Sequence, residues 1–141
     1  MPDPFNLQRF VDAQDRVFTQ VCSELRSGSK RSHWMWFIFP QIKGLGYSAV
    51  SVKYSISSLE EARAYLDHPN LGPRLRECTR LVNQIEGRSI EDIFGYPDHL
   101  KFHSSITLFA HAAPEDQVFQ QALEKFFQGE SDQLTLDRLR K

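Results

Sequence analysis

The chain has 141 residues and a formal net charge of -1, because 17 Lys and Arg residues are balanced by 18 Asp and Glu residues. With 40% hydrophobic residues the composition is typical of a folded globular protein, and the length suits a single domain spanning residues 1–141. The near-neutral balance provides no basic field, so we expect no nucleic-acid and no membrane partner.

The first predicted element is a helix. Apolar residues from Leu7 to Leu25 recur at the i, i+3, i+4, i+7 spacing of one helix face, which predicts one long N-terminal helix. Asn6 stands where its side chain would cap the first turn. Gly28 follows the last apolar residue and is expected to end the helix, because glycine readily takes a left-handed conformation.

The next segment, HWMWFIFPQ at 33–41, is apolar on every side and is therefore expected to be buried. Short apolar runs of this kind fit either a strand or a buried helical turn. The segment 47–56 is rich in β-branched residues, which disfavour a helix. These two segments are the candidates for a small strand pair.

Six later segments have apolar residues at helical spacing, and several start with a capping residue and end at Gly or Pro. They are 57–69, 70–87, 89–94, 97–114, 116–129 and 133–139. In the first of them Ser57 or Ser58 serves as the cap. The predicted fold is mainly α, a compact single-domain bundle of about seven helices, with the small strand pair as the minority alternative.

Polar residues at the ends of the aromatic run are candidates for a site. His33 and Gln41 stand at its two ends, where the polar termini of a buried element reach the rim of a cleft, although a solvated end is the simpler reading of each. Trp34 and Trp36 are expected in the core, and either one would also serve as a stacking wall.

The turn KGLGYS follows, and it contains Gly44, Gly46 and Ser48. The glycines permit positive φ, and Ser48 is placed to cap a following helix. Backbone N–H groups at such a turn suit a phosphate or carboxylate. The GxGxS pattern is neither a dinucleotide fingerprint nor a P-loop, so a plain turn is the alternative.

The segment 97–114 carries a second polar set. Asp98, Lys101 and Ser105 lie three and four residues apart and form one stripe on a helix. This stripe is either a salt bridge on a solvated face or, with the hydroxyls of Ser104 and Thr107, one side of a cleft. The HxxxH pair in this segment lacks the glutamate of a zinc protease motif, so no catalytic metal and no cofactor are expected.

Compartment follows from the termini and the cysteines. The N-terminus has no basic region followed by an apolar stretch, so no signal segment is expected. Cys22 and Cys78 match no zinc or redox spacing and are interpreted as small apolar core residues in a reducing environment. We therefore expect a cytoplasmic protein, with the oligomeric state left open.

Four strings together resemble a known family: SHWMWFIFPQIKGLGYS, YSISSLEEARAYLDHPNLGPRL, IFGYPDHLKFHSSITLF and FFQGESDQLTLDRL. The chain resembles the uncharacterised bacterial family called domain of unknown function 1810, often labelled calpastatin-like, from about residue 10 to residue 139. The resemblance implies a small, mainly α domain and no established activity. The signature positions it carries are His33, Trp34, Trp36, Pro40, Gln41, Gly44, Gly46, Ser48, His68, Pro69, Arg74, Asp98, Lys101, Ser104, Thr107 and Phe109.

The leading functional hypothesis is a protein that binds, or acts on, an anionic or nucleotide-like small molecule. Lys101 and Arg74 would hold charge, the turn would offer backbone donors and a tryptophan would stack on a ring. If the site is catalytic, His33 and Asp98 are the acid/base candidates. The ligand-binding candidates are Trp34, Gln41, Gly44, Gly46, Ser48, Arg74, Lys101, Ser104, Ser105 and Thr107. The alternative is a non-catalytic protein-interaction module.

Overall fold

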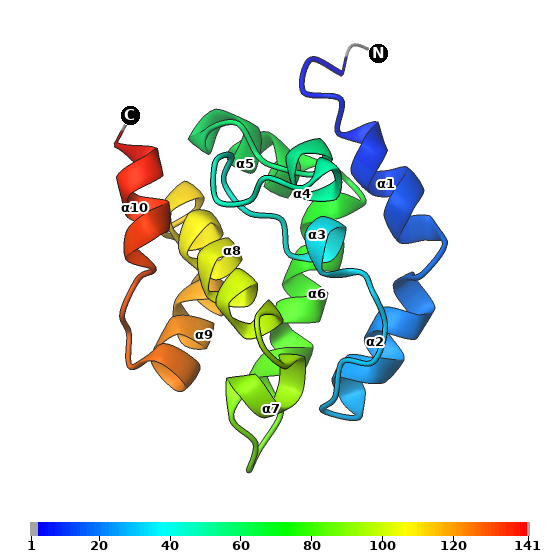
Figure 1. Ribbon diagram of the computed structural model, residues 1–141, viewed down its shortest axis with the longest axis vertical. Helices are drawn as coiled ribbons and strands as arrows, with labels where there is room; N and C mark the ends of the chain where they lie inside the picture. Colours follow the sequence, from blue (N-terminus) through cyan, green and yellow to red (C-terminus); the bar gives the residue numbers. More distant parts are fainter. Residues whose placement is uncertain (1–2, 141) are drawn as a thin grey trace.

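The computed structural model describes residues 3–140, and these residues form ten helices (Figure 1). The helices are α1 (Gln8–Asp15), α2 (Phe18–Arg26), α3 (Met35–Ile38), α4 (Ala49–Lys53), α5 (Leu59–Asp67), α6 (Leu71–Asn83), α7 (Ile90–Phe94), α8 (Asp98–Ala112), α9 (Gln117–Phe127) and α10 (Gln133–Leu139). The mainly α class is therefore confirmed.

The helix count differs from the prediction at three places. The long helix expected from Leu7 to Leu25 is broken into α1 and α2, with a turn at residues 16–17. The two segments considered as strands contain α3 and α4, each of only about one turn. Within residues 3–140 no strand forms, and the alternative of a strand pair is wrong. All that remains of it is one isolated parallel bridge between Ile42 and Ile56.

Most predicted helix ends are where the capping residues place them. The Ser58 hydroxyl accepts a hydrogen bond from the Glu61 amide at the start of α5. Gly28, at φ +76°, follows α2 as expected. The cap expected from Asn6 is wrong. Asn6 has φ +51°, and the carboxylate of Asp3 instead accepts the first amides of α1, from Leu7 at 2.8 Å and Gln8 at 3.0 Å.

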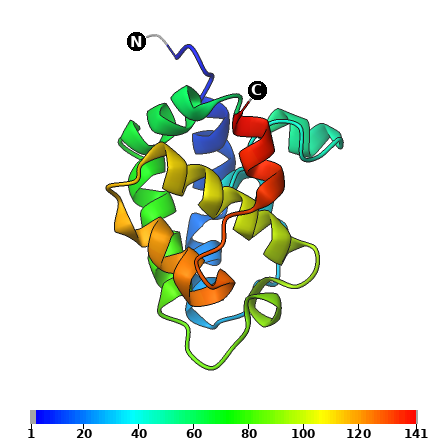
Figure 2. The same ribbon diagram turned by 90° about the vertical axis from the view of Figure 1, so that its left-hand side faces the viewer.

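Helices α6 and α8 lie at the centre of the bundle (Figures 1 and 2). Helix α2 packs against α6, α1 packs against α3, and α9 and α10 pack against α8. The core is strongly aromatic. The Phe102 ring of α8 lies 5.0 Å from that of Phe39 and 4.8 Å from that of Phe94. The edge-to-face and stacked pairs join α8 to the aromatic run and to α7.

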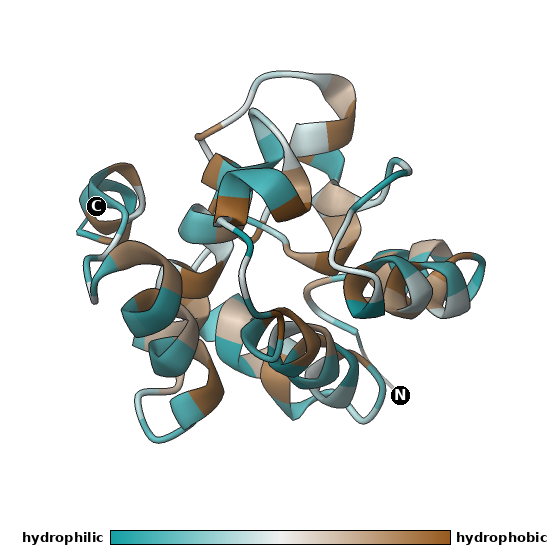
Figure 3. Cartoon of the chain, turned by 90° about the horizontal axis from the view of Figure 1, so that it is seen from below, coloured by the Kyte–Doolittle hydropathy of each residue, from teal (hydrophilic) through white to brown (hydrophobic). Residues whose placement is uncertain are grey.

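Seen from below in Figure 3, the longer helices each carry apolar and hydrophilic residues around their circumference. The hydrophilic sides belong to helices that each bury a stripe, as in α9, whose buried residues are Phe119, Ala122 and Leu123. Among the described helices, none is both long enough and apolar enough to cross a bilayer.

Candidate functional site

The segment leading into the aromatic run is organised by one buried carboxylate. Glu24 of α2 is 3% exposed. Its oxygens accept hydrogen bonds from the Arg31 amide (2.7 Å), the Ser32 amide (3.1 Å), the Ser32 hydroxyl, the Trp34 indole (3.0 Å) and the Gln20 amide (2.8 Å). Burial by itself would raise the pKa of the Glu24 carboxyl, but these hydrogen bonds, led by that from Ser32, lower it to about 2.

The two tryptophans consequently have different environments. Trp34 is 1% exposed and its indole N–H is committed to Glu24, so it belongs to the core. Trp36, two residues further on in α3, is only half-buried and lines a cavity. The Lys101 ammonium lies 4.1 Å from the centre of the Trp36 indole, a cation–π contact. The aromatic wall of the cavity is Trp36 rather than Trp34.

The cavity has a volume of about 200 Å³ and lies beneath the turn that follows the aromatic run. Its lining residues are Trp36, Gln41, Ile42, Lys43, Gly44, Gly46, Tyr47, Ser51, Val52, Tyr54 and Ser55. Two of its polar groups are the side-chain amide of Gln41 and the hydroxyl of Tyr54. Neither has a hydrogen-bond partner within residues 3–140. They are therefore available to a ligand in the cavity.

Backbone pairing fixes the wall of the cavity. The Ile56 amide donates to the Gln41 carbonyl and the Lys43 amide donates to the Ile56 carbonyl, both at 2.8 Å. Gly46 faces Ser51 so closely that an added Cβ would lie 2.8 Å from the Ser51 hydroxyl oxygen. A glycine at this position is explained by that close approach rather than by contact with a phosphate.

Ser48 does cap α4, as expected, because its hydroxyl accepts from the Ser51 amide at 3.2 Å. This bond uses one of the donors that the sequence hypothesis offered to an anion. Ser48 itself is exposed and does not line the cavity. The turn therefore contributes Lys43, Gly44, Gly46 and Tyr47 to the cavity lining.

Behind Trp36 lies an ion cluster. One carboxylate oxygen of Asp98 lies 2.7 Å from the Lys30 ammonium, and the other lies 2.9 Å from that of Lys101. Partial burial of Asp98 would raise its pKa, but the hydrogen bonds from Lys30 and Lys101 outweigh burial and lower the pKa below the ordinary value. Asp98 is thus held ionised as a structural counter-ion and is a poor proton donor or acceptor at neutral pH.

His33 does not join this cluster. Its side chain is exposed and is hydrogen-bonded neither to Asp98 nor to any other residue of the described chain. General acid/base catalysis by a pair needs both groups within hydrogen-bond reach of one substrate, with pKa values near the working pH. The geometry places no such pair at His33 and Asp98.

The hydroxyls of α8 face another element. The Ser104 hydroxyl donates to the Asp132 carboxylate at 2.9 Å, and the Thr107 hydroxyl accepts from the Asp132 amide at 2.9 Å. These bonds attach the start of α10 to α8. Ser105 is fully buried, and its hydroxyl is without a hydrogen-bond partner in the described chain. None of the three hydroxyls lines the cavity.

Arg74 of α6 is also elsewhere. Its guanidinium donates to Asp15 at 2.7 Å and to the buried amide of Gln14 at 3.4 Å. The contacts hold α6 to the corner between α1 and α2 rather than placing charge beside Lys101. The structure thus brings together only Trp36, Gln41, Gly44 and Gly46 of the signature positions in one cavity.

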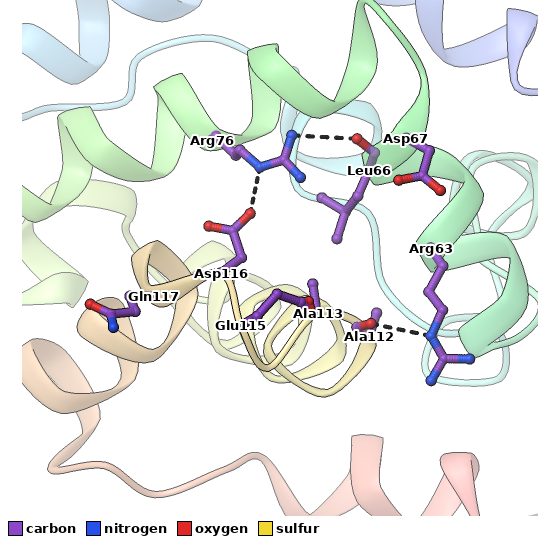
Figure 4. Close-up of a pocket in the computed structure, with 9 residues that line it drawn as sticks. All are labelled: Arg63, Leu66, Asp67, Arg76, Ala112, Ala113, Glu115, Asp116 and Gln117. Carbon is purple, nitrogen blue, oxygen red and sulfur yellow. Dashed lines mark hydrogen bonds and ion pairs between the residues drawn. The ribbon is translucent and has the colours of Figure 1, made fainter.

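A larger cavity of about 500 Å³ lies between α5, α6 and the α8–α9 connection (Figure 4). Arg63 donates to the Ala112 carbonyl at 3.2 Å at the end of α8, and Arg76 pairs with Asp116 and reaches the Leu66 carbonyl at the end of α5 (Figure 4). Both arginines therefore satisfy helix C-termini. In this larger cavity, Arg63 and Arg76 therefore hold neighbouring helices together.

Three contributors were missed by the sequence reasoning. Lys43 and Tyr54 line the cavity, and Glu24 orders the segment in front of it. Tyr54 was hidden in a segment interpreted as a possible strand. Glu24 gave no signal, because a glutamate in mid-helix is normally a solvated residue. Within residues 3–140, no three His, Cys, Asp or Glu side chains come together in a way that could hold a metal ion.

The sequence and the fold were compared with those of known proteins. The family model described as protein of unknown function (DUF1810) matches residues 4–139. The chain belongs to the DUF1810 family. Among solved structures, the conserved hypothetical protein Rv1873 from Mycobacterium tuberculosis is 58% identical, with a TM-score of 0.97 over 99% of each chain. No curated protein matches the sequence. The resemblance seen in the sequence is thus confirmed, and membership of DUF1810 brings a fold without an activity.

Proposed function

We propose that this protein binds a small anionic molecule with a planar, nucleobase-like ring, and that the cavity lined by Trp36 and Tyr54 receives the ring. The observation that carries the proposal is the combination of two aromatic side chains with the unpartnered Gln41 amide in one small cavity. Aromatic faces stack on planar rings, and an amide recognises the polar edge of a base.

The size of the cavity supports a single ring system. Sites for complete drug-sized ligands usually measure about 300–1,000 Å³. This cavity has about 200 Å³, so the ring would enter and the rest of the molecule would stay at the mouth. Lys43 stands in the wall, is exposed, and has no ion-pair partner in the described residues. It supports an anionic group at the mouth.

The ion cluster has a supporting role in the proposal. Lys30 and Lys101 share the single carboxylate of Asp98, which leaves the three groups with one net positive charge. The Lys101 ammonium lies against Trp36 and is 19% exposed. The cluster orients the indole and favours a negative ligand nearby.

The test is calorimetric titration with AMP, adenosine and inorganic phosphate. We expect AMP to bind more tightly than either part alone. Trp36→Leu should weaken AMP binding about tenfold or more, because a base stacked on an aromatic ring contributes about 1–3 kcal/mol. Tyr96→Leu, at a 75% exposed aromatic residue outside the cavity, is the control and should not change the affinity. Absence of AMP binding, or equal binding by Trp36→Leu, would refute the proposal.

A second candidate, a protein-interaction module, rests on exposed apolar side chains beside the same turn. Tyr47 is 88%, Val50 46% and Val52 56% exposed. Clustered exposed apolar residues are typical of interaction surfaces. This candidate predicts that a photoreactive residue at Val50 captures one defined protein in cells and that Tyr47→Ser abolishes the capture.

A further inference from the structure

Helix α10 contacts the turn at residues 43–48, which forms part of the cavity wall. It packs on α8 and lies apart from the α1–α2 pair (Figures 1 and 2). At its start, the Asp132 carboxylate accepts from the Ser104 hydroxyl at 2.9 Å and the Thr135 hydroxyl at 2.6 Å. Near its end, Arg138 donates through Nη2 to the Gly44 carbonyl at 3.1 Å. The turn and α10 are thus in direct contact across 94 residues of sequence.

Arg138 is a cation without a carboxylate. The acidic residue beside it, Asp137, is engaged by Gln133 at 2.9 Å and by Arg140 at 3.8 Å. Over residues 3–140, Arg138 makes no salt bridge. A guanidinium has five N–H donors, and the bond to Gly44 uses one of them. The others are free to bind two oxygens of a phosphate or a carboxylate in the bidentate manner of arginine.

Arg138 lines a second, outer cavity and contacts Gly44, which lines the inner one. Gly44 lines both the inner cavity of about 200 Å³ and an outer one of about 310 Å³, whose lining also includes Tyr47, Leu134, Arg138 and the carboxylate of Asp137. Tyr47 also lines both, so the two cavities adjoin through the turn. A ring in the inner cavity would therefore leave its anionic substituent pointing toward a guanidinium at the common wall.

The glycine at position 44 makes the approach possible. Gly44 has φ +100°, and an added Cβ would lie 2.7 Å from the central carbon of the Arg138 guanidinium. Any side chain here would displace the arginine. The glycine of the turn and the arginine of the last helix therefore form one arrangement, which the sequence does not reveal because the last helix reads as an ordinary amphipathic one.

We propose that Arg138 is the anion-binding residue of the cavity and that α10 acts as a strap whose attachment to the turn is strengthened when an oxyanion is bound. This inference rests on the proposed function, because it supplies the charged contact for a ligand whose ring occupies the inner cavity. The ligand class is a planar ring bearing a phosphate or a carboxylate. The bound anion would bridge the guanidinium and Lys43, tying α10 to residues 43–47.

The test compares Arg138→Ala with Arg140→Ala, a matched control two residues further on, at the C-cap of α10. In titrations with AMP, Arg138→Ala should raise the Kd about tenfold, because a hydrogen-bonded charge is lost from the mouth. Arg140→Ala should change the Kd less than about twofold, since Arg140 is paired with Asp137. Adenosine should bind all three proteins equally. Arg138→Lys should fall between the wild type and Arg138→Ala.

Hydrogen exchange measures the strap directly. Adding AMP should slow exchange of the amides of residues 133–139 in the wild type and in Arg140→Ala, and leave it unchanged in Arg138→Ala. AMP binding that is equal in the wild type and Arg138→Ala overturns this inference and leaves the proposed function standing. No binding of AMP to the wild type overturns both.

Discussion

The substitution Glu24→Gln tests how the aromatic segment is held in place. Glu24 is 3% exposed and accepts five hydrogen bonds, three of them from residues 31 and 32. The glutamine side chain has nearly the same shape, but it has one acceptor oxygen in place of two and carries no charge. Its NH₂ group would face donors. The segment between α2 and α3 should therefore loosen.

The pKa of Glu24 gives the size of the effect. Its fall from the ordinary value of 4.5 to about 2 corresponds to about 3 kcal/mol of folding free energy. Because the folded-state pKa is depressed, this contribution is present above the unfolded value of 4.5 and is lost as the pH falls toward 2. The difference between wild type and Glu24→Gln should be about 3 kcal/mol at pH 7 and about 1 kcal/mol at pH 3.

Urea unfolding of both proteins at a series of pH values measures this difference. Glu91→Gln, at an exposed position in α7, is the control and should change the unfolding free energy by less than about 0.5 kcal/mol. A difference below about 0.5 kcal/mol for Glu24→Gln at pH 7, or one that is the same at pH 7 and pH 3, would show that the carboxylate is not the organising group.

Three further substitutions test the packing around the site by chemical denaturation. Asp132→Ala removes the cap that joins α10 to α8 and should cost about 1–2 kcal/mol and speed amide exchange in α10, whereas Asp137→Ala should do neither. Asp98→Ala leaves the Lys30 ammonium, only 8% exposed, without its partner and should cost about 3 kcal/mol, part of which returns when Lys30→Met is added. Gly72→Ala should cost more than about 2 kcal/mol, because its Cβ would lie 2.0 Å from a backbone carbonyl oxygen of α5; full stability would refute that packing.

The sequence predicts the longer helices well for a physical reason. In α5 the Ser58 cap, the acidic first turn and Pro69 beyond the end are all local signals, and local hydrogen bonds satisfy them. Helices α6, α8 and α9 also lie within their predicted segments, although none of them has a side-chain cap. The break between α1 and α2 could not be predicted in this way, because the apolar stripe continues through it. Buried Gln14, hydrogen-bonded to the Phe37 carbonyl and the Tyr65 hydroxyl, shows that this corner is fitted to distant residues.

The site was less accessible to sequence reasoning than the fold. Asp98, Lys101 and Ser105 do follow one another at helical spacing, but their side chains have different surroundings. Asp98 pairs with Lys30, Lys101 lies against the Trp36 indole, and Ser105 is buried without a hydrogen-bond partner in the described chain. Which neighbour a polar side chain meets depends on contacts between segments far apart in the chain. That is why the turn at residues 43–47 could be proposed as a ligand site while its contact with Arg138 could not.

A crystal structure of the protein grown with AMP would show directly whether the cavity receives a nucleotide. We expect electron density for the adenine ring in the cavity lined by Trp36 and Tyr54, with the Gln41 side-chain amide at the edge of the ring and the phosphate within hydrogen-bond distance of Arg138. An empty cavity at saturating AMP, or AMP bound at a surface that shares none of these residues, would contradict it.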